Sequence, residues 1–430
     1  MEQKKKGIHY AWIIMIGCFL LQAGQLGIIM NTAGVFLQPV ADSIGCGRGD
    51  LSLYMTIMGW CTAFTMPIAG RWISTKNFNV LMVVVSVLAG GSFIAMSFFT
   101  QVWMWWIAAV VLGFSTAFTF FAAIPIVIQN WFAKKTGFAM GIATCSSGLG
   151  AAVFSPILTN LCVSMGWEST YVVAGVASLI LSVPVCAFVL KLKPADKGML
   201  PYGAEEGADV DQVAKAADTT GISASRAWKT GLVVVIFFIG ASISLTCSFG
   251  QHLAGFGTSV GLDATLTGLL LSMYQLGNLV AKIGMGTLND AIGIKKTFLV
   301  STAIPLIGVI LMIVSGGNTM MLLAGSLLYG FVNGNQTVLA PIICRKMFGA
   351  KDYAKMWSYS TMGNSILGAL GVSINGMLYD VSGTYLTPLT IVIVGSLVIS
   401  VVLVLFGLYR SSKVGFDKEE TVESAQLATA

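Results

Sequence analysis

The sequence predicts an all-α membrane protein in which twelve transmembrane helices form two pseudo-symmetric six-helix bundles. Three observations predict this class: an apolar composition, twelve apolar runs of spanning length, and a polar stretch that separates six runs from six. Of the 430 residues, 56% are hydrophobic and only 10% are charged, whereas soluble domains carry about 25% charged residues. A bilayer solvates such an apolar chain directly, so we expect the lipid bilayer to surround it.

The twelve runs each approach the length of about 20 apolar residues that a spanning helix needs. The first six lie near residues 11–36, 51–73, 79–99, 102–130, 137–164 and 169–190. The other six lie near residues 230–256, 265–288, 297–315, 319–343, 354–378 and 385–409. No small-residue cleavage site follows the basic start of the chain, so we expect the first run to remain as a helix.

The polar stretch divides the chain into segments, because its many acids and bases exclude a membrane span. We predict an N-terminal bundle over 1–191, a cytoplasmic linker over 192–228, a C-terminal bundle over 229–410 and a cytoplasmic tail over 411–430. The two halves also repeat at an offset of 216 residues, which pairs Gly45 with Gly261 and Gly70 with Gly286. Repeated halves are typical of carriers that hold their substrate between them.

The basic residues predict the orientation. Of 24 Lys and Arg residues, all except Arg48 and Lys282 fall in segments on one side of the predicted membrane. The positive-inside rule then places both termini in the cytoplasm and the chain in the cytoplasmic (inner) membrane as a multi-pass protein. These basic residues form short clusters rather than one face, so we expect no nucleic-acid partner.

Catalytic and metal-binding patterns are missing from the sequence. The eight cysteines have neither metal-ligand nor redox spacing. The two histidines, His9 and His252, lie near no Cys or acid in ligand spacing, and no phosphate-cradling Gly-Lys-Ser/Thr loop occurs. We therefore expect no enzyme activity and no cofactor; a membrane-embedded enzyme and a receptor are the alternatives from other functional classes.

The segment from Gly286 to Lys296 resembles the G-x-L-x-D-x-x-G-x-[RK]-[RK] loop of the major facilitator superfamily. The resemblance implies that its motif residues latch the inner gate: Gly286, Asp290, Gly293, Lys295 and Lys296. A carboxylate at a helix end can hold the N-terminus of a neighbouring helix. The first-half copy keeps Gly70, but Ser74 replaces the acid.

The segment from Trp131 to Gly141 resembles the W-F-x-x-[KR]-[KR]-G-x-A-x-G run of monocarboxylate transporters and of the oxalate:formate antiporter family. In the latter family a basic residue precedes the loop acid by eight residues on helix 8, as Lys282 precedes Asp290 here. The resemblance implies a secondary active transporter of a small organic anion, by antiport or proton-linked symport. Ser360 stands where a second base is expected, which favours a monocarboxylate over a dianion. Asn278 stands where proton-coupled members carry Asp, so a proton-carrying carboxylate is missing from that place.

Lys282 is the strongest candidate for a substrate contact. It lies eight residues, or about 12 Å of helix, from Asp290 and therefore within the hydrocarbon layer. No acid falls inside a predicted membrane core, so a substrate carboxylate would supply the missing charge. Snorkelling to the cytoplasm and a neutral structural role are the alternatives. Gln275 and Asn278 share its helix face at i, i+3 and i+7.

Other helices offer further candidates for substrate contact, each also open to an ordinary packing role. They are Gln25 and Asn31 in the first run, Phe121 in the fourth, Gln336 in the tenth and Ser360 in the eleventh. Gln22, Phe120 and Asn364 are neighbours of the same kind. We expect a monomer that works by alternating access, with a small carboxylate and a co-transported proton as candidate partners. A carrier for a neutral solute such as a sugar, or a drug exporter, is the alternative.

Overall fold

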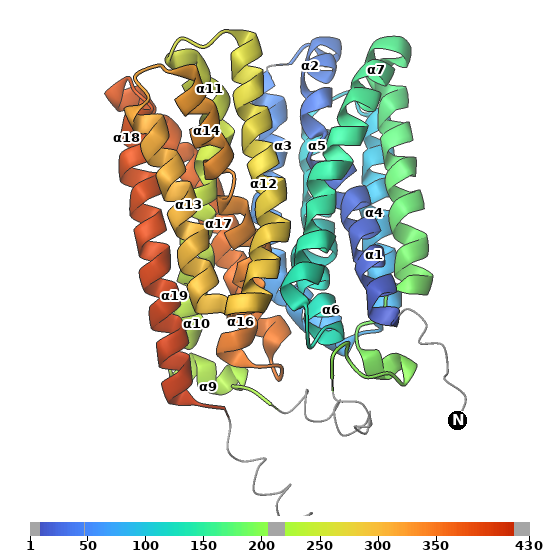
Figure 1. Cartoon of the computed structure of the whole chain (residues 1–430). Coiled ribbons are helices and arrows are strands. Elements are labelled where there is room, and N and C mark those ends of the chain that lie inside the picture. The colour runs from blue at the N-terminus through green and yellow to red at the C-terminus, as the bar shows by residue number, and fades with distance from the viewer. Residues whose placement is uncertain (1–8, 47, 205–219, 417–430) are drawn as a thin grey trace, which may run out of the picture.

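The structure, a computed structural model, describes residues 9–46, 48–204 and 220–416 of the chain. These residues form long helices that run side by side (Figure 1). Seven of the described stretches are long and apolar enough to cross a membrane by those criteria alone. The longest, Thr136–Val189 with 54 residues, holds two spans because Gly166, at φ +84°, interrupts it.

Within residues 9–46 and 48–204, the first bundle contains six helical rods, several of which change helix type along their length. Their parts are α1 (Tyr10–Gln22) with the π-helical η1 (Ala23–Met30) and α2 (Ala33–Ile44), α3 (Arg48–Thr75), α4 (Phe78–Ala95) with η2 (Met96–Phe98), α5 (Val102–Thr116) with the π-helical η3 (Ala117–Ala122) and α6 (Ala123–Trp131), and the bent α7 (Thr136–Pro184) with η4 (Val185–Val189).

The second bundle repeats this plan. Its parts are α10 (Leu232–Cys247) with η6 (Ser248–His252) and α11 (Leu253–Ser259), α12 (Ala264–Ile292), α13 (Ile294–Val314), α14 (Thr319–Tyr329) with α15 (Val332–Gly334), the π-helical η7 (Asn335–Leu339) and α16 (Ala340–Phe348), α17 (Tyr353–Ser382), and α18 (Leu386–Pro388) with η8 (Leu389–Val394) and α19 (Gly395–Val414). The twelve rods and two bundles confirm the predicted fold class.

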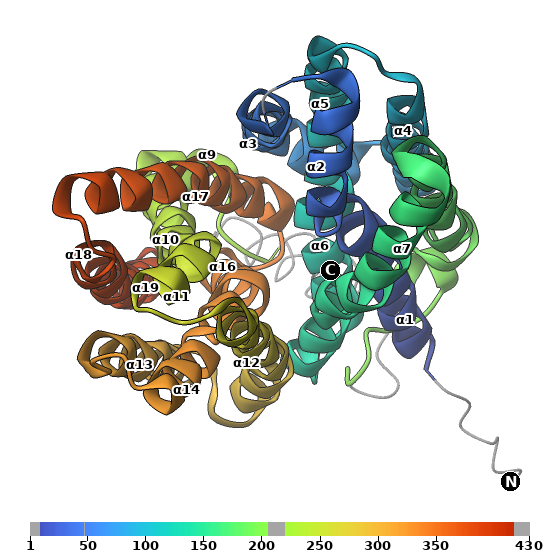
Figure 2. The same ribbon diagram turned by 90° about the horizontal axis from the view of Figure 1, so that it is seen from above.

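The two bundles stand side by side, as Figure 2 shows from above. Their junction pairs α12 with α7 and α3 with α17. The sequence repeat explains this symmetry. Gly45 and Gly261, which pair at the 216-residue offset, both have a positive φ, at +68° and +85°. Glycine adopts this left-handed geometry without the steric cost that a side chain brings, so the same turn precedes the second rod of each half.

The described ends of the predicted linker contact one bundle each. Tyr202 N–H donates to Trp131 O (2.8 Å), while Tyr202 O accepts from Ala133 N–H (3.0 Å). In the second half, Ile222 N–H donates to Phe348 O (2.8 Å). The short helices η5 (Pro194–Lys197) and α9 (Ala224–Lys229) lie in this segment. Linker residues 205–219 and tail residues 417–430 lie outside the described residues.

Candidate functional site

Lys282 lies in α12 at the junction of the two bundles. Its side chain is only 5% exposed. The Lys282 ammonium donates to Thr144 O (3.3 Å) and to Ser147 Oγ (3.3 Å), both in α7 of the other bundle. These two acceptors are neutral, and no carboxylate among the described residues lies within ion-pair distance of Lys282. The buried ammonium therefore lacks a counter-ion within the part of the chain that the structure describes.

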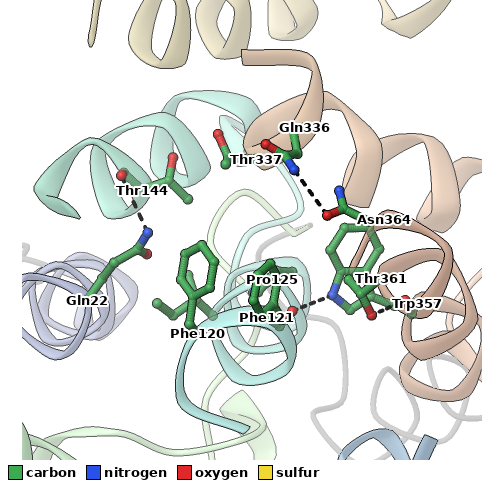
Figure 3. A pocket seen from close by; sticks show the side chains of 11 residues that line it. Gln22, Phe120, Phe121, Pro125, Thr144, Gln336, Thr337, Trp357, Thr361 and Asn364 are labelled. Carbon is green, nitrogen blue, oxygen red and sulfur yellow. Dashed lines mark hydrogen bonds between the residues drawn. The ribbon is translucent and has the colours of Figure 1, made fainter. Parts of the chain in front are cut away.

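A cavity of about 130 Å³ lies between the two bundles (Figure 3). The first bundle contributes Gln22, Phe120, Phe121, Ile124, Pro125 and Thr144. The second bundle contributes Gln336, Thr337, Trp357, Thr361 and Asn364. Because both bundles form its wall, a ligand in this cavity would contact both halves at once.

Thr144 connects the cavity to Lys282. Its backbone oxygen accepts from Lys282 Nζ and also from Gln22 Nε2 (3.5 Å). Gln22 is 1% exposed, and its Oε1 has no hydrogen-bond partner. Two donors thus converge on one carbonyl oxygen at one end of the cavity, next to an unused acceptor.

The opposite end of the cavity carries a pair of amide side chains, Gln336 and Asn364. Gln336 Nε2 donates to Asn364 Oδ1 (3.0 Å) and to Ser244 Oγ (3.4 Å). The rings of Phe120 and Phe121 lie between these two amide-bearing ends (Figure 3). Their centroids are 4.2 Å apart. Trp357 Nε1 donates to Phe121 O (2.6 Å) across the junction. None of the described residues that line the cavity is charged.

The π-helical segments coincide with this wall. Phe120 and Phe121 belong to η3, Gln336 and Thr337 belong to η7, and η1 begins directly after Gln22. A π-helical turn widens a helix locally and is frequent at functional sites. The two bundles thus present corresponding irregular turns to the same cavity.

Of the predicted contact residues, Phe121 and Gln336 line the cavity and Lys282 lies one residue away from it. Asn278 Nδ2 donates to Gln275 Oε1 (3.2 Å) on α12, where Gln275 is exposed. Asn31 is also exposed, and its Nδ2 donates to Ser147 O (3.2 Å). Lys282 and Asn31 therefore both contact Ser147 of α7, whereas Gln275 and Asn278 bond to each other along α12. None of these four residues is among those that line the described cavity.

Two predicted contact residues lie elsewhere. Gln25 Nε2 donates to Ser178 Oγ (3.4 Å) and Ser182 Oγ (3.0 Å), inside the first bundle. Ser360 is buried where α17 packs on α10, with its backbone against Gly240. Neither residue lines the described cavity.

Asp290, in the last turn of α12, connects the two bundles. It lies at the face where α1 begins and α19 ends, here called the terminal face. Asp290 Oδ1 accepts from Gly137 N–H (3.0 Å) and Oδ2 accepts from Phe138 N–H (2.9 Å), in the first turn of α7. A carboxylate is stabilised at this end of a helix by the helix dipole and the free amides. Gly286 and Gly137 pack backbone to backbone beside it, where a side chain on either would overlap the other.

The other motif residues lie around this contact. Gly293, at φ +79°, connects α12 to α13, and Lys295 and Lys296 are exposed at the start of α13. In the first half, Gly70 packs on Ala354 O of α17 in the position that corresponds to Gly286. Ser74 Oγ donates to Gly70 O (3.0 Å) within its own helix. The glycine contact is therefore present twice, whereas the carboxylate contact is made by Asp290.

Sequence reasoning did not name six of the lining residues: Ile124, Pro125, Thr144, Thr337, Trp357 and Thr361. It named Gln22 only as a neighbour of the candidates. Thr144 acts through its backbone oxygen, which residue type does not reveal. Trp357 offered one signal, because an indole N–H inside a membrane helix needs an acceptor.

Two six-helix bundles around a shared cavity define a membrane carrier. A family model described as Major Facilitator Superfamily matches residues 15–260 and 232–428. The chain therefore belongs to the major facilitator superfamily, whose members are transporters rather than enzymes.

Individual relatives are distant. The MFS-type transporter pytF of Aspergillus terreus is 25% identical over 292 residues, 66% of this chain and 90% of that protein. Monocarboxylate transporter 12 of Xenopus laevis is 21% identical over 409 residues, 90% of this chain and 87% of that protein. Among solved structures, the transporter FucP in the outward conformation has a TM-score of 0.68 at 13% identity, and covers 92% of this chain and 99% of its own. That likeness shows the fold.

Proposed function

We propose that this transporter carries a small organic anion, most simply a monocarboxylate, and that the Lys282 ammonium binds the carboxylate. The single observation that carries the proposal is the buried ammonium with two neutral partners and no carboxylate among its described neighbours. A charge inside the membrane is expensive unless a partner or water meets it. The anionic substrate would be that partner. Relatives named monocarboxylate transporters support the same class.

We propose alternating access as the mechanism, by antiport or proton-linked symport. The Asp290 contacts and the glycine contacts close the terminal face. The exposure of Asn31 and Gln275 supports an opening toward the opposite face. We assign the terminal face to the cytoplasm of an inner-membrane protein, because the basic loops gather there. The likeness to FucP, whose structure is titled an outward conformation, supports an opening away from the terminal face.

A neutral solute such as a sugar is the second candidate cargo. The amide pair Gln336–Asn364 and the aromatic rings could bind hydroxyl groups and sugar faces, and one structural neighbour is titled a fucose:proton symporter. This reading leaves the Lys282 charge without a role. A drug exporter for cations has less support, since the described acids occupy helix ends and loops rather than the cavity.

The first prediction concerns ligand binding by the purified full-length protein. A ligand that binds the native state raises the thermal midpoint of unfolding. We expect monocarboxylates, but neither sugars nor cationic drugs, to raise the midpoint of wild type, and Lys282→Gln to lose this shift. The matched control is Lys76→Gln, which removes an exposed lysine of the α3–α4 loop and should keep it. Equal stabilisation of wild type and Lys282→Gln by sugars would overturn the anion proposal.

A further inference from the structure

The cavity has a shape and polarity that restrict the anion. The apolar part of its lining is formed by Phe120, Phe121, Ile124, Pro125 and Trp357. Figure 3 shows Phe120, Phe121 and Pro125 between Gln22 on one side and Asn364 on the other. A formate or acetate ion at Lys282 would leave this apolar middle unfilled. Apolar surface removed from water is a main source of binding free energy, so the wall favours a substrate with a hydrocarbon body.

The size of the cavity sets the size of that body. Its volume is about 130 Å³, and an apolar protein cavity of ~150 Å³ holds one benzene molecule. The space therefore fits one six-membered ring or a branched chain of about six carbons. A two-ring body would need more than this volume.

The polar end beside Thr144 fixes the orientation of the anion. Lys282 Nζ and Gln22 Nε2 both point at Thr144 O, at 3.3 and 3.5 Å. A carboxylate that replaces this carbonyl would receive both donors, and charge-assisted hydrogen bonds are the stronger ones. The free Gln22 Oε1 lies beside it, and a buried acceptor without a donor is costly. A hydroxyl group next to the carboxylate would donate to this oxygen.

We infer that this cavity takes an amphipathic 2-hydroxy monocarboxylate whose apolar body has about six carbons, the shape of mandelate. The inference rests on the proposed function and specifies the substrate class of the same site. A dicarboxylate does not fit, because the described residues that line the far end are the neutral Gln336 and Asn364. A second buried carboxylate there would lack a cation.

The test measures dissociation constants of the purified full-length transporter by calorimetry. The probes are formate, butyrate, phenylacetate, mandelate and succinate. We expect affinity to rise about fourfold per methylene-sized group up to phenylacetate. Mandelate should bind about fivefold tighter than phenylacetate through its extra hydrogen bond. Succinate should bind no better than formate.

Two variants test the wall and the acceptor separately. Phe120→Ala enlarges the cavity and should bind 2-naphthylacetate more tightly than wild type does, a gain that misfolding cannot produce. Gln22→Leu should bind mandelate and phenylacetate equally. A flat size series that still depends on Lys282 would overturn this inference and leave the anion proposal intact. Failure of every carboxylate to bind would overturn the proposed function itself.

Discussion

At the scale of the residue, Lys282 combines the energetic cost of a buried charge with the substrate-binding role that we propose for it. A buried ammonium that meets only neutral oxygens has lost more hydration than two hydrogen bonds return. Natural proteins keep such groups mainly where function needs them, and activity then trades against stability. In our proposal, a bound anion would offset the cost of burying this charge.

The prediction at this scale is that Lys282→Met stabilises the empty protein. An apolar chain of similar length fills the same space without the desolvation cost, so we expect a gain of about 1 kcal/mol. The thermal midpoint without ligand should rise by roughly 2 °C, and substrate uptake should be lost. A clear fall in the midpoint would instead show that the Lys282 hydrogen bonds stabilise the contact between α12 and α7.

At the scale of the element, we propose that the α12–α7 contact at the terminal face acts as a reversible latch. Gly137 and Gly286 let the two backbones meet, and small residues permit such close crossings in membranes. Lys135, directly before α7, has φ +61° and is the single non-glycine residue with a positive φ among the described residues. This turn begins α7 where its free amides meet Asp290.

The prediction at this scale is that Asp290→Asn opens the latch. The amide keeps the shape but loses the charge, and its NH2 group replaces one of the two acceptor oxygens, so one hydrogen bond is lost and the other weakens. A cost of about 1.5 kcal/mol would lower the ratio of closed to open protein roughly tenfold. Distances between spin labels at Lys134 and Lys295, in a background without native cysteines, would report this opening.

Ser74→Ala is the matched control for the latch, because Ser74 bonds within its own helix. Its distance distribution should match wild type. A distribution for Asp290→Asn that stays closed would show that the glycine packing alone holds the terminal face.

At the scale of the whole molecule, the two bundles are equivalent in plan but not in chemistry. Each has a glycine contact, a π-helical turn at the cavity and a docked end of the connecting segment. Lys282 and Asp290 belong to the second bundle, and both bind α7 of the first. In the proposed mechanism, substrate binding and gating are therefore coupled through one helix pair.

The prediction at this scale concerns orientation in the membrane. Because the basic loops gather at the terminal face, we expect both chain ends in the cytoplasm. Green fluorescent protein fused after residue 430 should fluoresce in a bacterial host, and alkaline phosphatase fused there should be inactive. The opposite pattern would reverse the assignment of faces.

The sequence by itself determined the fold class, the repeat, the buried lysine and the family motif around Asp290. These features depend on composition and on spacing along one helix, which are local properties of the chain. The tertiary structure alone decided which side chains meet. Gln22 reaches Thr144 and the cavity while Gln25 binds Ser178, although both lie in the first rod. The physical reason is that the cavity is formed by helices from both halves of the chain, from Gln22 to Asn364, and their mutual rotation is set by packing rather than by periodicity.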